Sequence, residues 1–428
     1  MNHQGTGAAV ERRRIVVVGA SVRAMAQSAA ATGWEVHAAD FFGDLDLRAT
    51  ARDVMRLGPE HAYPHALVAL AAEWPAAPWC YTGALENHPD IIDAIAAVRR
   101  LAGNGGSAVR AVRDPLRLAE AVRSAGLLFP ETFRSPDGLP CDGSFIVKPL
   151  ASASGRGIRA WRPDAASLAA SAATHIWQHR VVGEPHAAAF IVAPGGATLL
   201  GLTRQLIGEP WCHAGPFSYC GSVTVPASAL PRSLAAQLDR LGGVLADEFR
   251  LVGAVGVDLM IDTDGRIWVV EINPRFTASM ELHERRCGGS VAAAHLHACG
   301  VSGVSGMSSD WRAVADDALP AMAWAKAVLH APHAIDVTTG LVAEWQAMAA
   351  AWSADDGGPA ALADIPAPGQ TIPARAPLLT IFARGAAPDA ALAGVTRRTA
   401  DVVASCPPAF SRPFAAAPSP PPPGTHTA

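Results

Sequence analysis

The sequence predicts an α/β protein with more than one subdomain, and three observations point to this class. The first is an apolar, β-branched run at residues 14–19 that ends in glycine, as buried parallel strands often do. The second is a helical composition after it that leads into another strand-like run, which suits a βαβ unit. The third is a change near residue 144 to short strands with glycine-rich turns, which indicates antiparallel pairing. With 428 residues, the chain is also too long for one ordinary core.

The N-terminal elements predict an open α/β domain over residues 13–110. The expected elements are, in order, a helix over residues 20–32, a strand over 34–40, and further alternation through 66–74 and 90–101. The turn that begins at Gly19 lacks the G-x-G-x-x-G spacing, so a nicotinamide dinucleotide is not predicted. Gly19 is instead expected to allow a tight strand-to-helix turn.

The middle of the chain is expected to hold mainly antiparallel strands. A helix that begins at Asp114 and stops at Gly126 comes first. Strand-like runs follow over residues 144–207, and residues 233–249 have helical periodicity. Two further apolar runs flank a D-x-D-G turn at residues 262–265, which predicts a β-hairpin.

After residue 300 the pattern weakens. Residues 300–320 are expected to be a loop, and the runs at 324–331 and 377–385 are expected to be strands of a third, smaller unit. The last stretch, residues 411–428, is rich in proline and alanine and is predicted to be disordered.

The composition excludes several classes of protein. The net charge is −4, the pI is about 6.4, and no long basic stripe occurs, so a nucleic-acid partner is not expected. The seven cysteines are scattered and include no C-x-x-C pair, which favours reduced thiols over disulfides or a zinc site. No charge-free apolar run reaches the roughly 18 residues of a membrane span. We therefore expect a soluble cytoplasmic protein that does not enter membranes.

Three side chains of the predicted hairpin suggest a metal site. Asp258 lies on its first strand, and Glu271 and Asn273 lie on its second. Residues opposite each other in a hairpin share a face, as do residues two apart on one strand. These oxygen ligands suit Mg²⁺, and acids within apolar strands are costly unless they are paired or bound to metal. Pro274 then ends the strand, and Arg275 offers a guanidinium suited to phosphate or carboxylate.

Two further segments could serve a nucleotide, although each alone has an ordinary structural interpretation. Lys148 ends an apolar run and precedes a loop of small residues, 151–157, whose backbone N–H groups could meet phosphates. The order of a Walker A loop is absent. Residues 177–184 could form a linker strand whose backbone meets adenine, with Glu184 placed to accept hydrogen bonds from ribose.

Taken in order, these elements resemble the ATP-grasp superfamily over about residues 111–290. The resemblance implies an α/β fold with an α+β ATP-grasp core: a Rossmann-like pre-ATP-grasp domain (13–110), a two-lobed ATP-grasp domain (111–299), a small C-terminal subdomain (300–405) and a disordered tail (406–428). It implies ATP and Mg²⁺, or Mn²⁺, as cofactors. The implied site residues are Lys148 and Arg275 for catalysis, Lys148, Ser154, Gly155, Gly157, Gln178, Arg180, Val181 and Glu184 for the nucleotide, and Asp258, Glu271 and Asn273 for the metal.

The sequence departs from the superfamily pattern near residue 114. Many relatives carry an Asp-Lys pair there whose lysine reaches ATP, but this chain reads Arg113-Asp114-Pro115. Either Arg113 or Arg117 would have to replace the lysine, or the contact is lost. His179 also stands where a carboxylate is frequent.

The opening segment, residues 19–46, and the stretch at 273–282 also look like a narrower group. This group consists of predicted ATP-dependent carboxylate–amine ligases of methanogens and of methylotrophic or planctomycete bacteria. It is similar to ligases of one-carbon cofactor assembly, such as those acting on methanofuran- or methanopterin-type molecules. The substrate inference rests on association alone.

The implied reaction is ATP-dependent activation of a carboxylate as an acyl-phosphate, followed by attack of an amine. Small molecules are the expected partners, and a homodimer stays open. One alternative is a carboxylase-type ATP-grasp enzyme that activates bicarbonate, and another is a regulatory ATP-binding protein without turnover. Five further residues carry chemically reactive side chains. Glu281 and His283 could face the acceptor or solvent, His295 and His297 should point apart on a helix, and Cys220 is expected to be a buried thiol.

Overall fold

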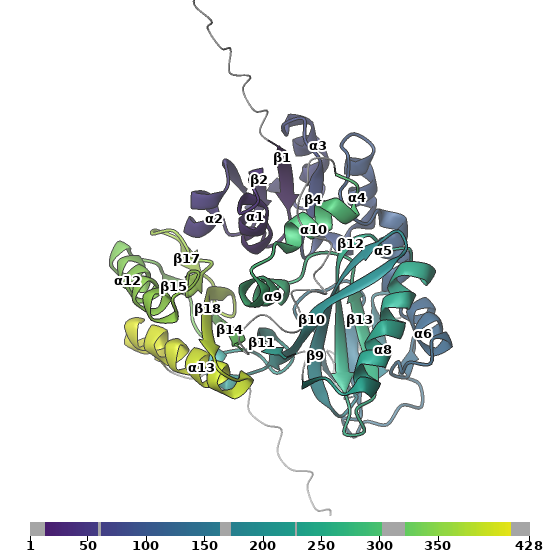
Figure 1. The fold of residues 1–428 in the computed structure, drawn as a ribbon. Coiled ribbons are helices and arrows are strands. Elements are labelled where there is room, and N and C mark those ends of the chain that lie inside the picture. Colours follow the sequence, from purple (N-terminus) through teal and green to yellow (C-terminus); the bar gives the residue numbers. More distant parts are fainter. Residues whose placement is uncertain (1–12, 59–60, 163–172, 227–228, 302–321, 412–428) are drawn as a thin grey trace, which may run out of the picture.

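The N-terminal part of the chain folds around a four-stranded parallel sheet. The computed structural model describes residues 13–58, 61–162, 173–226, 229–301 and 322–411. The strand order of the first sheet is β3-β2-β1-β4, and every pair in it is parallel. Its strands are β1 (Arg14–Val18), β2 (Glu35–Asp40), β3 (Asp53–Arg56) and β4 (Trp79–Tyr81). The predicted open α/β arrangement is therefore present (Figure 1).

Helices connect and flank these strands. They are α1 (Arg23–Ala30), α2 (Leu45–Thr50), α3 (Ala66–Glu73), η2 (Leu85–Asn87) and α4 (Pro89–Ala96). The expected helix over residues 20–32 begins only at Arg23, because the preceding residues form the turn after β1. A Cβ at Gly19 would lie 2.1 Å from Oγ1 of Thr82, so the tight turn predicted there requires glycine.

The second sheet has eight strands in the order β13-β12-β9-β10-β11-β14-β18-β16, with antiparallel pairing throughout. Its members are β9 (Glu184–Ala193), β10 (Gly196–Ile207), β11 (Tyr219–Val225), β12 (Gly253–Ile261), β13 (Ile267–Asn273), β14 (Ala323–His330), β16 (Leu362–Ala363) and β18 (Pro377–Gly385). The two strands expected in a third unit do form, but β14 pairs with β11 and so extends this sheet. Sequence spacing could not show that junction.

A small antiparallel sheet has its strands in the order β5-β8-β6-β7. Its strands are β5 (Thr132–Phe133), β6 (Phe145–Pro149), β7 (Arg159–Ala160) and β8 (His175–His179). Ahead of it come α5 (Gly106–Arg113) and α6 (Pro115–Ser124). The predicted start of α6 is confirmed, because the Asp114 carboxylate accepts from the backbone N–H groups of Leu116 and Arg117.

The remaining helices cover the large sheet, as Figure 1 shows for α8 in teal and α13 in yellow. They are α8 (Arg232–Gly243), the π-helical turn η5 (Val244–Glu248), α9 (Met280–Cys287), α10 (Val291–Ala298), α12 (Thr339–Asp356) and α13 (Pro388–Ser405). Two short strands, β15 (Ile335–Asp336) and β17 (Thr371–Ile372), pair beside them. Within the described residues, no helix is both long and apolar enough to cross a bilayer.

The chain end differs from the tail expected over residues 406–428. Cys406 and Phe410 are buried in the core beside α13, and η6 (Pro408–Ser411) follows that helix. A disordered tail therefore cannot begin before residue 412. The proposed tail beyond that point, and nearly all of the loop expected at 300–320, lie outside the described residues.

A buried ionic network joins the N-terminal sheet to the large sheet. Arg23 of α1 donates to Glu281 of α9 at 2.7 Å and to Asp364 at 2.9 Å. Lys326 of β14 donates to the same Glu281 carboxylate. Burial alone would raise the pKa of Glu281, but the charges of Arg23 and Lys326 hold it well below its usual range. Glu281 is only 5% exposed and His283 only 1%, so the solvent-facing alternative for these residues is wrong.

Removing one cation from this network should destabilise the fold. Arg23→Met would leave two buried carboxylates without their main partner, so we expect a loss of about 3 kcal/mol in the free energy of unfolding, measured by urea denaturation. Arg14→Met is the control, because Arg14 pairs with Glu35 at the surface, where its side chain is 48% exposed. Equal stability of the two variants would contradict a structural role for the Arg23 network.

Candidate functional site

The β12–β13 hairpin brings the three predicted metal ligands together. Asp258 pairs directly with Glu271 in the strand register, followed by a β-bulge. The side-chain amide of Asn273 donates to Asp258 at 3.0 Å, and Gln205 of β10 donates to the other carboxylate oxygen at 2.8 Å. The predicted hairpin and the predicted proximity of these three side chains are therefore confirmed.

The two carboxylates of this pair differ in charge environment. Burial, followed by the negative charge of Glu271, raises the pKa of Asp258 to about 6. Burial also acts to raise the pKa of Glu271, but Lys148 and Arg113 outweigh it and lower the pKa to about 2. Among the described residues, no group of three His, Cys, Asp or Glu side chains is placed to hold a metal. Any metal here would depend on two carboxylates and the Asn273 amide oxygen.

Two cations bracket Glu271, one on each carboxylate oxygen. Lys148 of β6 lies 2.8 Å from Oε2, and Arg113, at the end of α5, donates to Oε1 at 2.8 Å. Arg113 also donates to Asn87 at 3.0 Å and to the carbonyl of Leu150 at 3.2 Å. The alternative residue, Arg117, lies elsewhere on α6. Of the two arginines considered, only Arg113 reaches the cluster.

The loop that follows Lys148 is held close to the same cluster. Ser154, Gly155 and Gly157 all have positive φ, and a Cβ at Gly155 would lie 1.8 Å from the carbonyl oxygen of Phe217. The carbonyl of Ser154 accepts from the backbone N–H of Tyr219 at 3.4 Å, which ties the loop to β11. This close approach requires glycine and leaves the loop near Lys148 and Arg113.

The segment expected to bind adenine and ribose connects the small sheet to the large one. Gln178 is buried in β8, where its amide donates to Thr132 at 3.0 Å, so only its backbone could meet a base. Arg180 and Val181 follow β8, and Glu184 opens β9 at the surface. Across the residues that the structure covers, no hydrogen bond joins this segment to Asp258 or Glu271. The structure thus brings the metal, lysine and loop residues together, while Gln178 and Glu184 lie on strands that pair with those of Lys148 and Asp258.

Arg275 has a partner that the sequence did not suggest. Its guanidinium donates to Oε1 of Glu86 at 2.8 and 2.5 Å and to Asn273 Oδ1 at 3.2 Å. Glu86 follows β4 and is only 2% exposed. The available signal was its position, because ligands of open parallel sheets bind beyond the carboxyl ends of the strands. Glu86 thus joins the N-terminal unit to the hairpin.

Three other residues considered from the sequence, His295, His297 and Cys220, lie outside the cluster. His295 is buried, and its Nδ1 accepts from the backbone N–H of Ala254 at 2.9 Å, whereas His297 is exposed. Cys220 is fully buried, as predicted.

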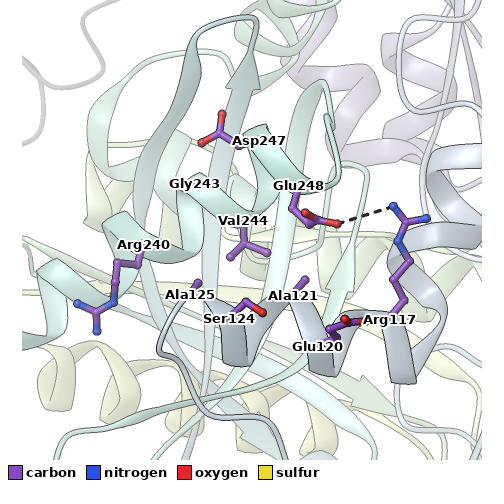
Figure 2. A pocket seen from close by; sticks show the side chains of 10 residues that line it. All are labelled: Arg117, Glu120, Ala121, Ser124, Ala125, Arg240, Gly243, Val244, Asp247 and Glu248. Atoms are coloured by element: carbon purple, nitrogen blue, oxygen red, sulfur yellow. Dashed lines mark ion pairs between the residues drawn. The ribbon is translucent and has the colours of Figure 1, made fainter.

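A depression of about 680 Å³ lies on the outer surface, away from this cluster. Figure 2 shows it between α6 and the end of α8, with Arg117 and Glu248 facing each other at 3.9 Å. Of the residues considered for the site, Arg117 alone is among those that line it. We therefore place the candidate site at the hairpin cluster.

Comparison with known proteins shows what the fold resembles. The ATP-grasp domain family matches residues 112–279, whereas no curated protein matches the sequence. Among solved structures, the chain is similar to an ADP complex of purK, N5-carboxyaminoimidazole ribonucleotide synthetase, with a TM-score of 0.65, 17% identity, and coverage of 91% of this chain and 97% of that one.

Two other solved structures have the same degree of likeness. An L-amino acid ligase from Bacillus licheniformis has a TM-score of 0.65 at 14% identity, covering 91% of this chain and 97% of that one. The biotin carboxylase domain of Hydrogenobacter thermophilus 2-oxoglutarate carboxylase, with MgADP, ADP and bicarbonate, has a TM-score of 0.65 at 11% identity, covering 92% and 90%. At such identities the likeness shows the fold. Residues 112–279 therefore form an ATP-grasp domain, set in a chain that shares the overall fold of these enzymes.

Proposed function

We propose that the chain is an ATP- and Mg²⁺-dependent ligase that activates a carboxylate as an acyl-phosphate and joins it to an amine. One observation carries the proposal: Lys148 and Arg113 converge on Glu271, directly opposite Asp258. The cluster thus contains cations that could bind phosphates, and it also contains carboxylates that could bind a metal. The chain's likeness in fold to an L-amino acid ligase and to purK, which is a synthetase, supports a ligase of this kind.

The donor set fits a hard divalent cation shared with phosphates. Asp258 and Glu271 are two partly buried carboxylates that face each other in the strand register, and the charge of Glu271 raises the cost of charging Asp258. Asp258, Glu271 and the Asn273 amide oxygen would hold Mg²⁺, or Mn²⁺, which would neutralise charge that develops on the phosphates. Phosphate oxygens compete with Glu271 for Lys148 and Arg113, and so would free its carboxylate oxygens for the metal.

The remaining nucleotide contacts follow from the position of each segment. Lys148 and Arg113 would bind the phosphates, and the backbone N–H groups near Ser154, Gly155 and Gly157 would close over them. The backbone of residues 178–181 would hold adenine, and Glu184 would accept from the ribose hydroxyls. Arg180 and Val181 belong to the segment between the two sheets, which suits a hinge between the lobes of the site.

The chemistry is two successive group transfers. A carboxylate oxygen of the substrate attacks the γ-phosphorus of ATP, and ADP leaves. The amine nitrogen, in its neutral form, then attacks the acyl carbon. The C–N bond forms as the bond to inorganic phosphate breaks, and the proton lost from nitrogen ends on the departing phosphate. Arg275 would stabilise the negative charge of the transferring phosphoryl group and of the acyl-phosphate. Exclusion of water by the loop would protect the acyl-phosphate from hydrolysis.

The substrate class is the least constrained part of the proposal. Likeness to the narrower ligase group favours a carboxylate and an amine of one-carbon cofactor biosynthesis, in a cytoplasmic enzyme with domains at 13–110, 111–299 and 300–405. Bicarbonate activation is a second candidate, since the similar biotin carboxylase domain was solved with bicarbonate. A regulatory protein without turnover is less favoured, because the cations and both carboxylates are all present and in contact.

Replacing Glu271 should stop catalysis without unfolding the protein. Glu271→Gln keeps the side-chain shape but removes a metal ligand charge, so ADP formation should fall about 100-fold while the chain stays folded, as judged by its circular dichroism spectrum. Asp264→Asn is the control, since Asp264 lies on the same hairpin turn but is 67% exposed. Normal ADP release by the Gln variant would refute the metal assignment.

Arg113 should matter for ATP and Arg117 should not. Arg113→Ala removes a charge 2.8 Å from Glu271, so we expect the KM for ATP to rise about tenfold, as for loss of one charged hydrogen bond. Arg117→Ala removes a guanidinium that lies 3.9 Å from Glu248 and over the Phe249 ring, outside the carboxylate cluster, so the KM of this variant should be unchanged. The reverse order of effects in steady-state kinetics would show that Arg113 does not replace the missing lysine.

The dependence of ADP release on co-substrates separates the candidate functions. With mixtures of carboxylic acids and primary amines, a ligase should release ADP only when both are present. ADP release that depends on bicarbonate would favour a bicarbonate-activating carboxylase instead. A protein that binds MgATP but releases no ADP with either set would contradict both enzyme proposals.

A further inference from the structure

The carboxyl edge of the N-terminal sheet meets the candidate site beside Arg275. In the order β3-β2-β1-β4, the chain runs from β1 to β2 and β3 on one side and then crosses to β4 on the other side of β1. The point at which the strand order reverses therefore lies between β1 and β4. Open parallel sheets bind ligands beyond their strand ends at such a point. The chain that leaves β4 passes Gly83, whose Cα faces the Arg275 guanidinium, and reaches Glu86 in η2. This inference rests on the proposed ligase function.

Glu86 offers a buried carboxylate oxygen that the fold leaves without a donor. Its Oε1 accepts both hydrogen bonds from Arg275, but its Oε2 is buried and has no hydrogen-bond partner among the described residues. The side chain as a whole is 2% exposed. A buried acceptor without a donor costs stability, and a charged one costs more, so this oxygen requires a donor from outside the described residues.

Tyr63 provides a second unpartnered group near Glu86, because its ring contacts His88, which lies two residues after Glu86 in the chain. Its hydroxyl is also buried without a partner among the described residues. Burial, and then the negative charge of Glu86, raises the pKa of Tyr63, so the phenol stays protonated. The Tyr63 ring makes edge contacts with Phe41, at 4.7 Å between centroids, and with His88, at 5.8 Å.

The chemistry of this corner favours a cationic nitrogen. Carboxylate oxygens only accept hydrogen bonds, while a phenol hydroxyl can accept from one donor as it gives to another. The rings of Tyr63 and Phe41, which contact each other, would attract positive charge and tolerate an alkyl stem. Burial lowers the pKa of the nearby His88, so its ring brings little competing charge at neutral pH. An anion would face the Glu86 oxygen and be repelled.

We propose that Glu86 Oε2 and the Tyr63 hydroxyl bind the ammonium group of the amine substrate. Arg275 links Glu86 to Asn273, and Asn273 contacts Asp258, so the amine is held next to the carboxylate cluster where the acyl-phosphate would form. The N-terminal sheet therefore supplies the recognition of the amine, and the hairpin supplies the nucleotide end of the reaction.

Direct binding tests this assignment on the full chain. The probe is n-butylammonium chloride, titrated calorimetrically into protein saturated with MgADP. Tetramethylammonium chloride has the same charge but no N–H group and should not bind. Tyr63→Phe removes one hydroxyl and should weaken butylammonium binding about tenfold, and Glu86→Gln should abolish it.

Tyr81→Phe is the matched control, because the Tyr81 hydroxyl donates to the Asn104 carbonyl at 2.7 Å and should leave butylammonium binding unchanged. Should Glu86→Gln perturb the fold, Tyr63→Phe alone still decides, since it keeps the Arg275–Glu86 pair. Equal affinity of the wild type and Tyr63→Phe, or no butylammonium binding while MgADP binds, would overturn the inference. Failure of MgADP itself to bind would instead contradict the proposed ligase function.

Discussion

The bracketing of Glu271 by Lys148 and Arg113 is the interaction on which the candidate site depends. Each cation is 2.8 Å from one carboxylate oxygen, and the three side chains come from a small sheet, a helix and the hairpin. Separating such charges from water is costly unless each finds a partner, so none of the three elements could shift alone without leaving a charge unpaired. The pairing thus fixes where phosphates and metal could meet, and the loop after Lys148 lies against it.

The N-terminal sheet is joined to this centre by charge as well as by packing. Glu86 holds Arg275, and Asn87, next to it in η2, accepts from Arg113 and donates to the Ser152 carbonyl at 3.4 Å. One short segment thus contacts both arginines of the site and its glycine-rich loop. Farther out, the Arg23 network ties the same sheet to β14. A substrate bound at the sheet edge would therefore meet a site whose parts are already positioned.

The hairpin could be predicted from sequence because its signals are local: a D-x-D-G turn, alternating strands, and acids two residues apart. The Asp114 cap and the tight turn at Gly19 are local in the same sense. The role of Glu86, the burial of Glu281 and the extension of the large sheet by β14 could not be predicted. Arg23 and Asp364, for example, are 341 residues apart in sequence, and a single sequence carries no signal for such a contact.

The central claim is that the hairpin cluster binds a nucleotide together with a divalent metal. Calorimetric titration of the wild-type chain with ADP, with and without Mg²⁺, tests it most directly, because it needs no knowledge of the carboxylate or the amine. We expect one ADP per chain in the presence of Mg²⁺ and an affinity at least tenfold weaker when the metal is removed by chelation. Absence of ADP binding, or an affinity that Mg²⁺ does not change, would contradict the account.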